Sequence, residues 1–197
     1  MIIRKILQHD LARLVSFAKK TFIDAFAHLN DPVDFEAYIN EAFTLEKYQK
    51  EFDTEGSVFY LLEDGKILFG YLKLNIRKSP RDIHKPLIYQ KQRFIKQNML
   101  EIERIYIDKT TQSKGLGLKL VEYAEQIAHE NHCTDIWLGV WDRNPKAIRF
   151  YESCGFKPFG EHVFTIGTDD QTDILMLKKI PKYNAIPYPS NSFGGAQ

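Results

Sequence analysis

The sequence predicts an α/β fold in which a mixed central β-sheet is flanked by helices. Three observations support this prediction. Amphipathic helical patterns occupy the first part of the chain, two β-rich segments follow, and strands then alternate with helices before a last pair of strands. Helices and strands in this order bury their apolar faces against one another in layers. The 197 residues suffice for one large domain.

The N-terminal part contains two helical patterns and a third start signal. Apolar side chains recur every three or four residues over about 10–27, behind Asp10 as a capping candidate. A second helix is expected to begin at Asp31 and Pro32, an N-cap followed by the proline that a first helical turn tolerates, and to run through Ala42. Thr44 is placed to begin a third, short helix.

The middle of the chain changes to a strand pattern. SVFYLLE and KILFGYLKLNI, on either side of Asp64-Gly65, predict a β-hairpin. The polar stretch 77–100 predicts a loop with a helical turn near 90–97. A strand over 102–107, a loop with glycines and a long amphipathic helix over about 116–128 come next.

The last third of the chain predicts a strand over 134–141 and a helix that is opened by Asn144-Pro145 and closed by Gly155. Two final strands, roughly 156–166 and 172–179, flank a polar turn at 167–171. After Pro181 the composition shifts to Tyr, Pro, Ser, Asn and Gly without periodicity. We therefore expect one domain over 1–181 and a mobile tail over 182–197.

Composition excludes several classes of protein. Lys and Arg number 27 against 26 Asp and Glu, a net charge of +1, so the chain has no overall field to hold nucleic acid or an acidic membrane. No apolar run approaches the ~18 residues of a membrane-spanning helix, and the N-terminal apolar stretch is too short for a signal peptide. The two cysteines, Cys133 and Cys154, fit no metal motif. We expect a soluble cytoplasmic protein with reduced thiols; a homodimer is left open.

The segment from Gln112 to Leu118 is the strongest functional signal. Glycines between a strand and a helix let backbone N–H groups approach a phosphate at the positive end of the helix. The segment is no dinucleotide fingerprint, because Leu120 stands where a third glycine or alanine belongs, and it is no Walker loop, because no Gly-Lys-Ser/Thr ends it. Taken alone, it is equally well explained as a structural turn.

Two stretches together resemble a known family. IERIYIDKTTQSKGLG resembles the Q/R-x-x-G-x-G/A motif, and WDRNPKAIRFYESCGF the N-x-x-A-x-x-F-Y-x-x-x-G-F motif, of the GNAT superfamily of acyl-CoA-dependent N-acetyltransferases. The resemblance covers about residues 2–180. TFIDAFAHLN, GYLKLN, LGVWDRN and the H-x-F-x-x-G-x-D-x-Q-x-D pattern from His162 to Asp173 more narrowly resemble the PaiA-type spermidine/spermine N-acetyltransferases.

The resemblance implies that acetyl-CoA is the co-substrate and indicates where it binds. The glycine loop would hold the pyrophosphate, mostly through backbone amides, and an exposed strand edge would pair with the pantetheine amides. Asn144 would also contact the cofactor, although Asn before Pro is an ordinary N-cap. The expected cofactor-binding residues are Ile105, Tyr106, Ile107, Gln112, Ser113, Lys114, Gly115, Leu116, Gly117 and Asn144.

The resemblance suggests one catalytic residue, Tyr151, and the chemistry of the acceptor suggests a second, Glu103, a carboxylate on the predicted central strand. Tyr151 would be the general acid that protonates the departing CoA thiolate; its alternative role is that of a core tyrosine on an amphipathic helix. Glu103 is the candidate for the base that takes a proton from the acceptor ammonium, directly or through water. A charge pair between Glu103 and Arg104 is the structural alternative.

The other reactive side chains are not expected to have a catalytic or metal-binding role. Cys154 is interpreted as a small buried hydrophobe rather than a nucleophile, since direct transfer needs no covalent enzyme intermediate. His162 with Asp169, Asp170 and Asp173 matches no standard ligand spacing, so no metal is expected.

The acceptor implied by the resemblance is a primary amine of a small molecule, in particular a polyamine. Tyr38 and four acidic residues lie in the helical segment that borders the acceptor pocket in such folds, and a solvated acidic helix face is the alternative explanation. Those acidic residues are Asp31, Asp34, Glu36 and Glu41. Two other functions stay open: acetylation of a protein or peptide, and non-catalytic binding of acyl-CoA by a regulator.

Overall fold

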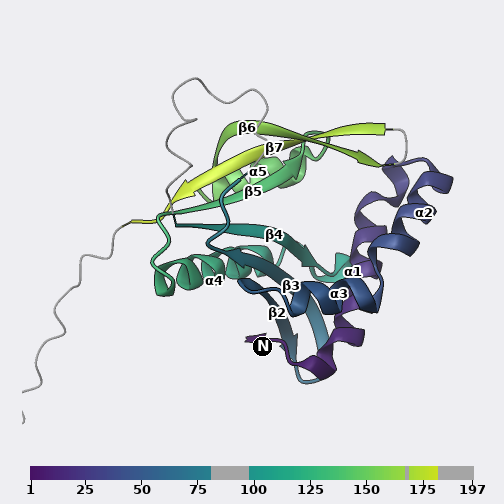
Figure 1. Cartoon of the computed structure of the whole chain (residues 1–197), viewed down its shortest axis with the longest axis horizontal. Coiled ribbons are helices and arrows are strands. Elements are labelled where there is room, and N and C mark those ends of the chain that lie inside the picture. The colour runs from purple at the N-terminus through teal and green to yellow at the C-terminus, as the bar shows by residue number, and fades with distance from the viewer. Residues whose placement is uncertain (81–97, 167–168, 182–197) are drawn as a thin grey trace, which may run out of the picture.

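A computed structural model describes residues 1–80, 98–166 and 169–181. Seven strands of these residues form one mixed sheet in the order β1-β2-β3-β4-β5-β7-β6 (Figure 1). Neighbouring strands are antiparallel except for β4 and β5, which are parallel. The predicted α/β fold with a mixed central sheet is confirmed.

The elements follow one another in nearly the predicted order. The strands are β1 (Ile2–Lys5), β2 (Ser57–Asp64), β3 (Ile67–Ile76), β4 (Met99–Ile107), β5 (Asp135–Trp141), β6 (Lys157–Ile166) and β7 (Asp169–Lys179). The helices are α1 (Leu11–Phe26), α2 (Pro32–Ala42), α3 (Leu45–Phe52), α4 (Leu116–Glu130) and α5 (Pro145–Ser153).

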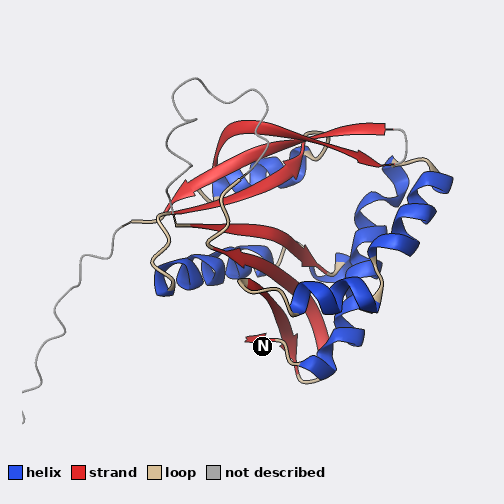
Figure 2. Ribbon diagram, viewed as in Figure 1, coloured by secondary structure: helices blue, strands red, loops and turns tan. Residues whose placement is uncertain are grey.

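Helices cover both faces of the sheet (Figure 2). The first face packs on α4 and α5, and its apolar cluster joins Leu120 and Tyr151 of these helices to Leu100 and Leu138 of the central strands. The second face packs on α1 and α3 over β2 and β3. Farther along the second face, a smaller cluster of Met99, Trp137, Phe159 and Leu175 lies over β4–β7. We call these the α4 face and the α1 face.

The parallel pairing between β4 and β5 is short. It joins Met99–Glu101 to Asp135–Trp137, and within the described residues the ladder ends there, although both strands continue. On its other side β4 stays paired with β3 as far as Ile107. The edge of β4 that faces β5 is therefore free of β5 beyond Glu101, which leaves a wedge between the two strands.

A bulge in β4 lies at the start of this wedge. Leu74 of β3 pairs with Ile102 and Lys73 pairs with Arg104, so Glu103 is an extra residue on β4. Side chains alternate between faces along a regular strand, and a one-residue bulge interrupts the alternation. Contacts place both Glu103 and the following Arg104 on the α1 face, where they meet Lys73 and Glu51.

Three predictions about local structure need correction, and one strand was missed. The loop predicted over 77–100 ends earlier, because Met99 and Leu100 already belong to β4 and pair with β5. The strand β1 was not predicted, because only its pairing with β2 distinguishes four residues from a loop. Asp10 occupies the N-cap position of α1 but makes no capping bond; its carboxylate accepts from Arg4 and from the Leu7 N–H instead. The polar turn predicted over 167–171 is shorter, because Asp169, Asp170 and Gln171 continue the ladder with β6.

Other predictions agree with the structure or cannot be compared with it. Glycine closes α5 as expected, with Gly155 at φ +89° and Phe156 N–H donating to Tyr151 C=O. The helical turn predicted near 90–97 and the tail over 182–197 lie outside the described residues. None of the helices in the described ranges is long and apolar enough to cross a bilayer.

Candidate active site

The glycine loop presents unpaired amides at the start of α4. Gly115 is the N-cap of α4 with φ +74°, and Ser113 also has a positive φ of +63°. No side chain in the described part of the chain caps this helix, whereas α2, α3 and α5 are capped by Asp31, Thr44 and Asn144. The first amides of an uncapped helix form an anion site. The loop therefore fits a pyrophosphate.

A lysine that the sequence analysis overlooked lies beside this loop. Lys146, in the first turn of α5, donates from Nζ to Gln112 Oε1 at 3.0 Å, and Gln112 Nε2 reaches the Ile107 carbonyl at 3.4 Å. Gly117 is where the two helices come close, because a Cβ there would lie 3.2 Å from Cζ of Phe150. The loop is thus tied both to the end of β4 and to α5.

The free edge of β4 has its side chains in the core. Ile105 and Ile107 pack against the cluster on the α4 face, whereas Tyr106 points to the α1 face and stacks on Tyr71 with 5.5 Å between ring centroids. Only the backbone of these residues is left to face the wedge. This arrangement fits pairing with an amide-bearing arm such as pantetheine.

Tyr151 of α5 is buried in the apolar cluster on the α4 face. Its ring packs against Phe150 and Phe156, and burial raises the pKa of its hydroxyl well above the ordinary value. Burial raises the pKa of Tyr106 as well, and Arg104 opposes that shift. Tyr151 stays protonated at neutral pH, as a general acid must.

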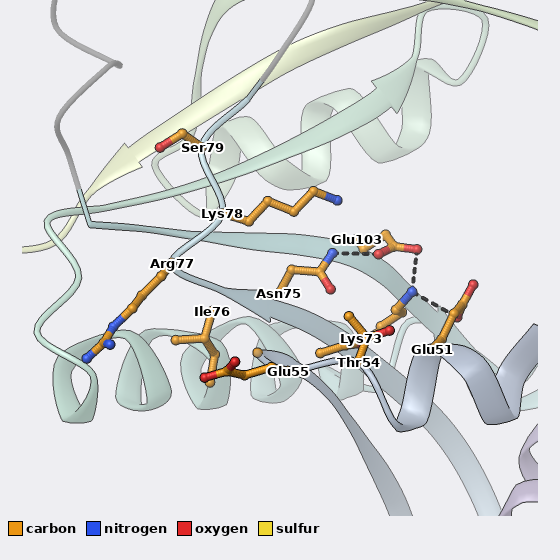
Figure 3. Close-up of a pocket in the computed structure, with 12 residues that line it drawn as sticks. Glu51, Thr54, Glu55, Lys73, Asn75, Ile76, Arg77, Lys78, Ser79 and Glu103 are labelled. Atoms are coloured by element: carbon orange, nitrogen blue, oxygen red, sulfur yellow. Dashed lines mark hydrogen bonds and ion pairs between the residues drawn. The ribbon is translucent and has the colours of Figure 1, made fainter.

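Glu103 lies in a network of ion pairs rather than alone (Figure 3). Its Oε1 is 2.7 Å from Lys73 Nζ and 3.1 Å from Arg104 Nη2, and its Oε2 accepts from Asn75 at 2.5 Å. Burial would raise the pKa of this carboxyl, but Arg104 and Lys73 outweigh burial and lower it. The charge pair with Arg104 that the sequence left open as an alternative is present.

Two cavities adjoin this network on the α1 face. The larger, about 580 Å³, lies between α3 and β3 and is drawn in Figure 3. The smaller, about 300 Å³, lies where β4 and β5 separate, and residues of β4, β5, β6 and β7 line it. Lys78, Ser79 and Glu103 line both. The smaller cavity has three carboxylates, Glu101, Glu103 and Asp173, against one lysine.

The acidic residues of α2 do not line either cavity. Asp31 caps α2, Glu41 pairs with Lys47 at 2.9 Å, and Glu36 is exposed. These residues therefore form a solvated acidic helix face, which was the alternative explanation from the sequence. Glu101 and Asp173, which do line the smaller cavity, had no local signal that singled them out as acceptor-site residues.

The contacts of Asn144 and of the two cysteines are those of residues that stabilise the fold. Asn144 accepts from the Ala147 N–H at 3.1 Å as the cap of α5, so a cofactor contact stays a prediction. Cys133 and Cys154 are buried free thiols whose pKa burial raises. Among the described residues, no three His, Cys, Asp or Glu side chains gather so that they could hold a metal ion.

Comparison with known proteins identifies the family. The model of the acetyltransferase (GNAT) family matches residues 23–156. An uncharacterized N-acetyltransferase from the pepI 3′ region of Lactobacillus delbrueckii subsp. lactis is 38% identical over 174 residues, 88% of this chain and 94% of that protein. The chain belongs to the GNAT family and is an acetyl-CoA-dependent N-acetyltransferase.

Solved structures share the fold at lower identity. The PaiA N-acetyltransferase from Thermoplasma acidophilum, solved in complex with coenzyme A, has a TM-score of 0.66 at 23% identity, covering 90% of this chain and 98% of that one. The spermidine N-acetyltransferase from Vibrio cholerae, solved with CoA and spermine, has a TM-score of 0.62 at 23% identity, covering 91% of this chain and 95% of that one. At such identities the likeness extends to the fold only.

Proposed function

We propose that this enzyme transfers the acetyl group directly to a primary amine of a small cytoplasmic molecule, and that the acceptor is a polyamine such as spermidine or spermine. The observation that supports this most is the group of carboxylates that lines the smaller cavity, at the wedge between β4 and β5, where no cation among the described residues pairs with Asp173. A polycation needs its charges compensated when it leaves water. The similarity of the fold to a spermidine N-acetyltransferase agrees with this choice but does not decide it.

In this proposal the glycine loop and the free edge of β4 hold the co-substrate. The amides at the start of α4 bind its pyrophosphate, with Lys146 nearby as a further positive charge. The edge at Ile105, Tyr106 and Ile107 pairs with the pantetheine arm. When bound there, acetyl-CoA supplies the activated acetyl group.

Tyr151 is the proposed general acid. Burial raises the pKa of its hydroxyl, which therefore stays protonated at neutral pH and can give its proton to the departing thiolate. Glu103 is the candidate base from the sequence, and it lines the cavity as such a role requires. Its pairing with Lys73 and Arg104 weakens it as a base, because both cations stabilise its ionised form.

A panel of acceptors tests the proposal. CoA release from acetyl-CoA is measured with spermidine, spermine, a monoamine of matched length, amino acids and peptides. We expect kcat/KM to be highest for the polyamines and their KM to increase with added salt, because ions screen attraction between the cavity carboxylates and a polycation. The KM of the monoamine should change less.

The outcomes separate the alternatives. If kcat/KM is no higher for polyamines than for the monoamine, and the KM of polyamines does not change with salt, the proposal of a polyamine acceptor is wrong. The assignment as an N-acetyltransferase still holds. Preferred turnover of peptides would favour acetylation of a protein. Tight binding of acetyl-CoA without CoA release for any amine would favour a non-catalytic regulator.

A further inference from the structure

We infer that Asp173, on β7, is the base that accepts the proton of the acceptor ammonium. This inference rests on the proposed function and assigns its deprotonation step to Asp173 in place of Glu103. Glu103, the candidate from sequence, then has the role of holding Lys73 and Arg104 in place.

Asp173 reaches the smaller cavity across a glycine. In the sheet it pairs with Trp141 of β5 on one side and His162 of β6 on the other. A Cβ on Gly139 of β5 would lie 3.1 Å from Asp173 Oδ2. The carboxyl thus leans over Gly139, where β5 carries no side chain, and both residues line the cavity at the wedge.

The other two carboxylates of this cavity are already paired. Glu101 accepts from Asn75 and lies 2.7 Å from Lys78 Nζ. Glu103 has Lys73, Arg104 and Asn75. Among the residues that the structure describes, no hydrogen-bond or ion-pair partner of the Asp173 carboxylate is found. It is the carboxylate of the cavity that an ammonium can approach without displacing a protein cation.

The surroundings of Asp173 also make it a stronger base than Glu103, whose pKa is lowered. Burial, reinforced by the charge of Asp142 after β5, raises its pKa to about 6. His162 on β6, Glu101 and Glu103 on β4, and Lys78 are the other ionisable groups around this cavity. A carboxyl with a pKa of about 6 is still mostly ionised at pH 7, and it accepts a proton more readily than one of ordinary pKa.

The proton transfers balance as follows. The acceptor ammonium gives one proton to the Asp173 carboxylate, which releases the free electron pair of the amine. The amine nitrogen then bonds to the acetyl carbon, the carbon–sulfur bond breaks, and the thiolate takes the hydroxyl proton of Tyr151. The second N–H proton is lost through solvent and restores Tyr151, while Asp173 returns its proton to solvent. One proton is released per turnover.

The test is the pH profile of kcat/KM for spermidine with the full-length enzyme. For wild type, kcat/KM should rise with pH and level off above about pH 6, as the Asp173 carboxyl of the free enzyme ionises; we call this rise the limb near pH 6. Asp173→Asn should lower kcat by about 100-fold and remove this limb, leaving a rise that follows deprotonation of the amine itself. Thermal melting and titration with acetyl-CoA check that this near-isosteric variant is folded and binds its co-substrate.

Two matched variants separate Asp173 from its neighbours. Glu103→Gln and His162→Gln should retain the rise of kcat/KM near pH 6, whatever they do to the maximum rate. His162 is included because it lies opposite Asp173 in the sheet and lines the same cavity. Loss of the limb in either variant would overturn the inference. So would a folded Asp173→Asn enzyme with an unchanged limb, or one with raised KM and normal kcat, which would make Asp173 a binding residue only.

Failure of the proposed function looks different. If wild type releases no CoA with any of the amines tested, the proposed function itself is wrong, and the inference about Asp173 is wrong with it. If wild type acetylates amines and Asp173→Asn does so with the same profile, only the inference fails.

Discussion

Burial has useful consequences for two single residues that we propose to move protons. For the Tyr151 hydroxyl, burial raises the pKa and keeps the proton available for the thiolate. For the Asp173 carboxyl, burial raises the pKa to about 6 and makes the ionised group a better acceptor. One physical effect, exclusion of water, thus favours both the proposed acid and the proposed base.

Replacement of Tyr151 by phenylalanine removes only the hydroxyl. We expect kcat to fall on the order of 100-fold with saturating amine, while the affinity for acetyl-CoA measured by calorimetry stays the same. Tyr123→Phe is the control, because Tyr123 packs against Tyr60 with 5.0 Å between ring centroids, away from the cavities. Near-normal turnover of Tyr151→Phe would return Tyr151 to the role of a core residue.

Gly117 tests whether the start of α4 binds the pyrophosphate. Valine there would push against Phe150 and place a branched side chain beside the amides. We expect acetyl-CoA affinity to weaken at least tenfold, equivalent to ~1.4 kcal/mol. Leu118→Val is the matched control, since Leu118 is 44% exposed in the same helical turn. Unchanged affinity in a folded Gly117→Val protein would contradict the assignment.

At the scale of elements, the bulge in β4 decides which charges meet. It places Glu103 and Arg104 on the same face, against Lys73 of β3 and Glu51 of α3. Lys73 is almost completely buried, with Nζ 2.8 Å from Glu51 and 2.7 Å from Glu103. These ion pairs join the helical layer to the strand that borders the wedge.

Loss of Lys73 should therefore destabilise the fold strongly. Lys73→Met leaves two partly buried carboxylates short of a partner, and we expect the free energy of unfolding to fall by about 3 kcal/mol. Lys47→Met, which removes the exposed pair with Glu41, should change it far less, because water screens that pair. Urea denaturation measures both. Equal effects would mean that the buried network adds no more stability than a surface pair.

Elements that local signals define were predicted from the sequence, whereas features that depend on distant pairing were not. The helices α2 and α5 were predicted from caps and prolines that act within a few residues, and the glycine loop from its place between strand and helix. The strand β1, the bulge at Glu103 and the approach of Asp173 to Gly139 depend on pairing between distant segments. No local pattern records such pairing. The prediction of Glu103 as a base could not anticipate Lys73 and Asn75 from the neighbouring strand.

At the scale of the whole molecule, the proposed site draws on both halves of the sheet. The glycine loop, the free edge and Glu103 belong to β4 and the segment after it, whereas Tyr151 and Asp173 follow from β5 onward. The two halves meet in the sheet through Met99–Glu101 and Asp135–Trp137. The relative position of acid, base and co-substrate therefore depends on this short junction.

The shortness of that junction gives the co-substrate a second role as a missing strand. Without it, the β1–β4 and β5–β7 halves should open as separate cooperative units, and amides over Ile102–Ile107 that point into the wedge should exchange their hydrogens rapidly. Bound acetyl-CoA would bridge the halves, slow that exchange and merge the two openings into one, adding about 2.7 kcal/mol at a ligand concentration 100 times Kd. Native-state hydrogen exchange with and without acetyl-CoA measures this, and identical protection in both states would contradict it. The enzyme would then be most rigid only while it holds the group it is about to transfer.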